Sequence, residues 1–191
     1  ISSKDLPLVD SVQLEHARAL CRRDEQKVEL SSLVRDTVIC GSVVRIRKGF
    51  RGNLQIFASD SVIVEEGAML EYPSGIYVDS GERRPYVSLE RGSKVNGYII
   101  VTSENSDSQL RYPSYVQKSG ATINGLLYVD GSCNIEGDII GAAYVKDCYY
   151  YSNGNVYAGT LYDARVVRSD SLAFPIFLKG PYERKMIRKL H

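Results

Sequence analysis

The chain has 191 residues, which is enough for one sizeable core or for one core with a small appendage. Its 24 Lys and Arg residues balance 23 Asp and Glu residues, so the net charge is only +1 and we expect no nucleic-acid partner. The apolar runs are far shorter than the ~20 residues that cross a bilayer, which predicts no membrane span within the chain.

The N-terminal part, residues 1–37, is predicted to be a helical extension that caps the rest of the chain. Residues 9–30 contain few glycines or β-branched residues and favour a helix, with Ser11 as a candidate N-cap. Its apolar stripe would be formed by Leu14, Ala17 and Cys21 or by Val12, Ala19 and Leu20.

Residues 38–170 are dominated by a glycine-punctuated repeat. Val95-Asn-Gly97 and Ile123-Asn-Gly125 have the same pattern, and Ile135-Glu-Gly137 follows as a further copy. Each copy is too short to bury its own apolar face, and stacking the copies solves this problem. We therefore predict an all-β fold, a right-handed parallel β-helix or solenoid. A meander of hairpins that turn at Asn96-Gly97 and Asn124-Gly125 is the alternative.

Aromatic residues are unevenly distributed, with 14 Tyr, 4 Phe and no Trp. Several tyrosines cluster between residues 144 and 162, and on consecutive coils some of them would form an outward ladder about 4.8 Å apart. Tyrosine rings offer apolar area with a polar tip, which suits stacking on sugars as well as the support of strands. The residues predicted to contact a glycan or a partner are Tyr149, Tyr150, Tyr151 and Tyr157.

The C-terminal residues 171–191 differ again in composition. The apolar run from Phe174 to Leu178 precedes a short basic stretch, residues 181–190. Because the end of a solenoid exposes an open core and unpaired backbone groups, we expect this segment to be a cap followed by a solvated basic tail.

The glycine-aliphatic units from Val87 to Gly141 resemble those of bactofilins and similar polymer-forming bacterial proteins. The resemblance covers about a third of the chain and implies a right-handed β-helix that stacks end to end into filaments. The candidate capping helix, the long insertions and the apolar C-terminal segment depart from that family's pattern. They favour a capped domain over a filament.

Catalytic and metal sites find little support in the sequence. A hexapeptide acyltransferase would need a histidine base in the repeats, but the histidines are His16 and His191. The aspartates suit solvated turns, so we expect no catalytic residues, no cofactor and no metal site. The cysteines show no zinc-ligand spacing. They are compatible with two disulfides or with buried thiols: Cys21, Cys40, Cys133 and Cys148.

These observations together favour a non-enzymatic structural or interaction protein of the bacterial cell envelope. It would present a rigid β-helix surface for adhesion to a protein partner, to itself or to a glycan. The chain begins with Ile1, so an upstream signal or anchor would place it in the periplasm or on the surface, with the cytoplasm as the alternative. The competing functions are a polysaccharide-acting lyase or hydrolase on the same scaffold and a bactofilin-like filament former.

Overall fold

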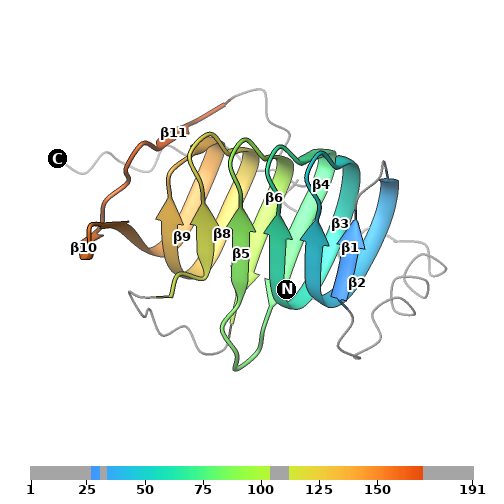
Figure 1. The fold of residues 1–191 in the computed structure, drawn as a ribbon, viewed down its shortest axis with the longest axis horizontal. Helices are drawn as coiled ribbons and strands as arrows, with labels where there is room; N and C mark the ends of the chain where they lie inside the picture. The colour runs from blue at the N-terminus through green and yellow to red at the C-terminus, as the bar shows by residue number, and fades with distance from the viewer. Residues whose placement is uncertain (1–26, 31–33, 104–111, 170–191) are drawn as a thin grey trace, which may run out of the picture.

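The computed structural model describes residues 27–30, 34–103 and 112–169, and these form an all-β structure (Figure 1). The strands belong to a single 11-stranded sheet. They are β1 (Lys27–Leu30), β2 (Val34–Ile46), β3 (Arg51–Val64), β4 (Met69–Asp79), β5 (Tyr86–Leu89), β6 (Lys94–Thr102), β7 (Tyr115–Gln117), β8 (Thr122–Ile135), β9 (Asp138–Ser152), β10 (Asn155–Ala158) and β11 (Arg165–Val167).

Six of these strands close into a ring of parallel pairings. The ring runs β3, β4, β6, β8, β7 and β5, and β5 pairs back to β3. Closure depends on β3 and β8, which have 14 residues each and pair with two strands of the ring and with one strand outside it. β3 pairs with β4 up to Ala58 and with β5 from Ser61 onward. The described chain is therefore a closed six-stranded parallel β-barrel, with β2 and β9 paired to its two long strands.

The predicted β-helix or solenoid is thus wrong as a fold class, although the all-β class is right. Both architectures use short parallel strands punctuated by glycine, so the repeat pattern does not distinguish them. What closes the barrel is the length and bending of β3 and β8. In β8 the bend coincides with a register shift between Val129 and Ser132 relative to β9.

The predicted helix over residues 9–30 is also wrong where the structure describes it. Lys27–Leu30 is strand β1, which pairs in parallel with residues 43–46 of β2. The rest of the predicted helix lies outside the described residues, as does the predicted C-terminal cap at 171–191. β2 begins at Val34, so the expected boundary at residue 37 falls inside a strand. Within the described ranges, no helix is long and apolar enough to span a membrane.

The core forms because alternate residues of each strand point inward. In β3, Leu54, Ile56 and Ala58 are buried, whereas Phe57 between them is 42% exposed. The fully buried aliphatic residues of the other strands join the same cluster: Val44, Ile46, Leu70, Ile76, Val78, Val87, Leu89, Val95, Ile99, Val101, Ile123, Leu127 and Ile139.

The stacking of the glycine repeats is confirmed in one place and wrong in another. Val95 and Gly97 of β6 pair with Ile123 and Gly125 of β8, as the repeat predicts. The next partner of Ile123 is Ile139, not Ile135. Ile135 pairs with Gln117 of β7 instead. The second copy of the sequence echo therefore belongs to a different part of the barrel.

A carboxylate secures the turns between the first strands. Glu65 accepts hydrogen bonds from Arg45 Nη1 at 3.1 Å, Arg47 Nη1 at 3.0 Å and the Lys48 N–H at 3.0 Å. The Lys48 N–H bond lowers the pKa of Glu65 most, burial opposes it, and the two arginines lower it further. Glu65 therefore stays ionised and joins the turn after β2 to the turn after β3.

Candidate ligand groove and aromatic row

The tyrosine-rich segment folds into a hairpin. The end of β9 pairs antiparallel with β10, with Tyr150 opposite Tyr157 and Ser152 opposite Asn155. The two loop residues, Asn153 and Gly154, have positive φ angles of 50° and 79°. Asn-Gly is the dipeptide that favours a two-residue loop with positive φ at both positions. The candidate hairpin turns in the sequence were Asn96-Gly97 and Asn124-Gly125. The observed turn is Asn153-Gly154, which has the same dipeptide.

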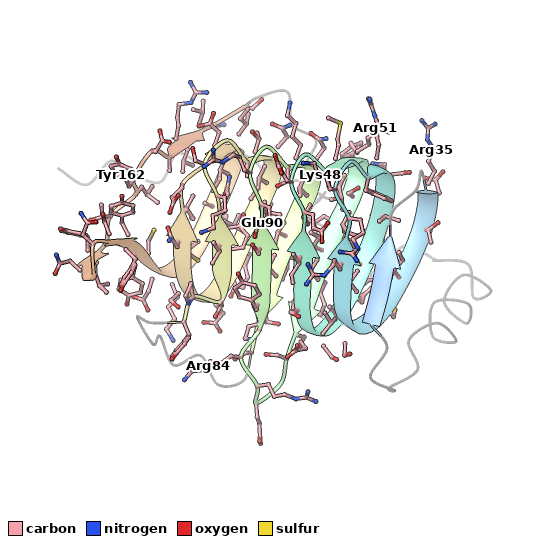
Figure 2. All side chains as sticks on the ribbon, viewed as in Figure 1. Arg35, Lys48, Arg51, Arg84, Glu90 and Tyr162 are labelled. Carbon is pink, nitrogen blue, oxygen red and sulfur yellow. The ribbon has the colours of Figure 1, made fainter. Side chains whose placement is uncertain are left out.

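The four tyrosines predicted to contact a ligand do not form one ladder. Tyr150 lies on one side of the hairpin, where its ring stacks on Tyr162 with centroids 4.3 Å apart and lies 6.1 Å from Tyr157. Tyr149 and Tyr151 point to the other side, because residues alternate along a strand. Figure 2 shows Tyr162 at the end of the molecule formed by β9 and β10. The contact role of these four residues stays a prediction.

Tyr149 and Tyr151 line a groove of about 650 Å³. Its wall comes from segments far apart in the chain: the start of β5, the residues before and in β7, the end of β8, and the hairpin. The lining residues are Tyr86, Tyr112, Pro113, Val116, Lys118, Cys133, Asn134, Tyr149, Tyr151, Gly154 and Val156. Four tyrosines thus meet at one concavity, and sequence reasoning identified two of them.

The groove has few polar groups, and two of them lack an ion-pair or hydrogen-bond partner among the described residues. Lys118 is exposed and forms no ion pair with any described residue. The Asn134 Oδ1 atom is buried and has no hydrogen-bond partner. At the rim, the Arg84 guanidinium lies over the ring of Tyr112, 5.6 Å from its centroid. Figure 2 shows Arg84 on the lower edge of the molecule.

The cysteines in and near the groove are not reactive groups. Cys133 is fully buried, and burial raises the pKa of its thiol well above the ordinary value. Burial also raises the pKa of Cys148, its register partner on β9. Because the thiolate is the nucleophile, neither cysteine is activated near neutral pH. Both are free thiols, as the sequence allowed, whereas Cys40 is disulfide-bonded.

A second feature lies on the outer face of the barrel. One outward position of five neighbouring strands is aromatic or aliphatic, in an unbroken register: Phe57, Tyr77, Ile100, Tyr128 and Tyr144. We call this set the aromatic row. Three of its members stand three residues after a repeat glycine: Ile100 after Gly97, Tyr128 after Gly125 and Tyr144 after Gly141. That spacing is visible in the sequence itself.

Carboxylates also gather at one shallow surface of about 510 Å³. It is lined by Glu65, Glu66 and Glu90 together with Lys48 and Arg91. These groups are already engaged: Glu65 as described above, Glu66 with Lys48 Nζ at 3.0 Å, and Glu90 with the Ser88 hydroxyl at 2.5 Å. Elsewhere the aspartates are dispersed. The prediction that they occupy turns is wrong for Asp138, which begins β9 and pairs with Arg165 at 3.1 Å.

No group of three or more metal-ligating side chains occurs among the described residues. Comparison with family models, with curated proteins and with solved structures finds no match. The resemblance to bactofilins therefore stays a prediction, and the groove and the aromatic row are the features from which a function is inferred.

Proposed function

We propose that the chain is a non-enzymatic interaction protein of the bacterial cell envelope that binds a glycan in the tyrosine-lined groove. The observation that carries the proposal is the convergence of Tyr86, Tyr112, Tyr149 and Tyr151 on one concavity. Tyrosine rings supply apolar faces that stack on a sugar ring and hydroxyls that bond its edge.

The dimensions of the groove favour a glycan over a folded protein partner. A volume of about 650 Å³ falls in the range of small-ligand sites, which span roughly 300–1,000 Å³. A stable protein interface instead needs a patch of about 800 Å² on each partner. The rigid barrel holds β5, β7 and β8 in fixed register, so this wall of the groove is preformed.

The disulfide at Cys40 supports a location outside the cytoplasm, because disulfides persist in oxidising compartments. Alkylation of thiols in intact cells, followed by mass spectrometry of the peptide that contains Cys40, tests this. We expect no labelling at Cys40 before reduction. Full labelling without reduction would place the protein in a reducing compartment.

The binding proposal is tested by titrating soluble oligosaccharides into the wild-type protein and into Tyr151→Ala. Loss of a stacking ring should weaken binding about tenfold or more, since aromatic contacts contribute roughly 0.5–1.5 kcal/mol beyond their buried area. Tyr144→Ala, in the aromatic row, is the matched control because Tyr144 is equally exposed but lies outside the groove. Binding that depends on Tyr144 and not on Tyr151 would move the site to the aromatic row.

One observation favours the second candidate, a polysaccharide-acting enzyme. Three glutamates share a shallow surface with Lys48 and Arg91, as general acid-base chemistry on sugars requires. Against it, the lowered pKa of Glu65 makes this carboxyl a weak base near neutral pH. Incubation with polysaccharides and assay of new reducing ends or unsaturated products decides between the two. Activity that is lost in Glu90→Gln would overturn the non-enzymatic proposal.

A further inference from the structure

We infer that the groove selects an acidic saccharide, one whose pyranose rings carry a carboxylate, such as a uronic acid. This inference rests on the proposed function and names the ligand class of the same groove. It comes from the charges around the groove, which differ from those of the chain as a whole.

The charged side chains described at the groove are positive. Among the lining residues that the structure describes there is one cation, Lys118, and no Asp or Glu. The Arg84 guanidinium at the rim adds a second positive charge close to Tyr112. The whole chain is nearly neutral at +1, so this bias is local to the groove. A cationic cleft with apolar walls concentrates anionic ligands.

The lysine is also available. Lys118 follows directly after β7, is exposed, and has no carboxylate within ion-pair distance among the described residues. Lys48 and Arg51, by contrast, are engaged by Glu66 and by Glu71 at 2.6 Å. An ammonium left without a counter-ion beside four tyrosines provides the charge-assisted bond that a ligand carboxylate needs.

The remaining lining groups match the rest of a sugar. The tyrosine rings cover apolar ring faces, and the Asn134 amide, whose Oδ1 has no partner, lies in the same wall. A ligand with hydroxyls and one carboxylate per ring therefore pairs with the tyrosine hydroxyls and with Lys118 together, whereas a fatty ligand pairs with neither.

The experiment uses calorimetric titration of the full chain with uronic acid trisaccharides of three kinds, galacturonate, glucuronate and mannuronate, each beside its methyl ester. The ester keeps the sugar and removes the charge. We expect at least one acid to bind about tenfold or more tightly than its ester, because hydrogen bonds to charged groups are the stronger class. Added salt should weaken binding of the acid and leave the ester unchanged.

Variants separate the charge from the groove. Lys118→Gln should reduce the acid's affinity about tenfold and make it equal to that of the ester, and Arg84→Gln should have a smaller effect in the same direction. Lys94→Gln is the matched control, an exposed lysine at the start of β6 outside the groove. All three residues are exposed, so unfolding of the variants is readily checked by thermal denaturation.

The outcomes distinguish this inference from the proposed function. Equal binding of acid and ester, both lost in Tyr151→Ala, overturns the acidic specificity and leaves a glycan-binding groove. Acid binding that Lys118→Gln does not change also overturns the inference. Absence of binding by all six trisaccharides overturns the acidic specificity, and absence of binding by neutral oligosaccharides as well overturns the glycan-binding groove. Binding by an acidic peptide with none by the sugars would replace the glycan with a protein segment.

Discussion

The same dipeptide, Asn-Gly, occupies two kinds of position in this protein. In β6 and β8, Asn96-Gly97 and Asn124-Gly125 lie within strands and stack on one another in register. At Asn153-Gly154 the dipeptide turns the chain through 180° between β9 and β10. The local sequence is equal, so the neighbours in space decide which structure forms.

The neighbours differ in how closely they approach. A Cβ on Gly125 would lie well inside contact distance of the Gly97 carbonyl oxygen, while a Cβ on Gly154 would meet nothing within 4 Å. The asparagines differ too. Asn124 Nδ2 donates to Asn96 Oδ1 at 2.5 Å, and Asn96 Nδ2 donates to the Leu70 carbonyl at 3.0 Å. The barrel uses Asn-Gly for close packing and a side-chain ladder, and the hairpin uses it for its backbone conformation.

The largest effect should come from the glycines. Gly125→Ala combines a clash with backbone and a φ of 150°, so we expect a loss of more than about 4 kcal/mol in unfolding free energy. Gly154→Ala adds only the cost of positive φ, about 1 kcal/mol. Urea denaturation of both variants measures the difference. Equal losses would contradict the close approach of β6 and β8.

A smaller effect is expected from an isosteric change of the asparagines. Asn124→Asp replaces the donor to Asn96 Oδ1 with an acceptor, which should cost about 2 kcal/mol at neutral pH. Asn153→Asp should cost less than about 0.5 kcal/mol, because Asp-Gly forms the same turn. Denaturation at two pH values is the measurement. Partial recovery of Asn124→Asp in acid, where the carboxyl can donate, is the expected signature of the ladder.

The hairpin itself should depend on its tyrosine stack. Tyr150→Ala removes the ring that contacts Tyr162, and we expect a loss of about 1 kcal/mol that is confined to the hairpin. Tyr150→Phe keeps the ring and serves as the control. Hydrogen exchange of the amides in β10 should accelerate in Tyr150→Ala alone, while those in β6 and β8 stay protected. Faster exchange throughout the barrel would show that the two regions unfold together.

The smallest effect concerns pH and the turns of the barrel. The folded pKa of Glu65 is lowered, so its contribution is present above its ordinary pKa of 4.5 and is lost as the pH falls through the folded value. Glu65→Gln should therefore reduce stability at neutral pH and flatten its decline in acid. Glu66→Gln is the control, because the ion pair of Glu66 with Lys48 is exposed. Parallel pH profiles for wild type and Glu65→Gln would exclude this role.

The candidate site was only partly predictable. Tyr149 and Tyr151 were identified from a local run of tyrosines, and both line the groove. Tyr86, Lys118 and Asn134 carried no local signal, because each is an ordinary strand or turn residue until other strands pair beside it. Ile100, Tyr128 and Tyr144 of the aromatic row were predictable in principle from their constant distance to the repeat glycines.

The sequence alone determined the all-β class and the parallel match of Val95–Gly97 with Ile123–Gly125, because alternation and glycine conformation act within a few residues. The tertiary structure alone decided that the sheet closes, that Ile123 pairs with Ile139, and that Tyr86 and Tyr149 share one groove. These features depend on which distant strands pair. Similar glycine-aliphatic copies offer several nearly equal partners, and only burial of the complete core selects among them.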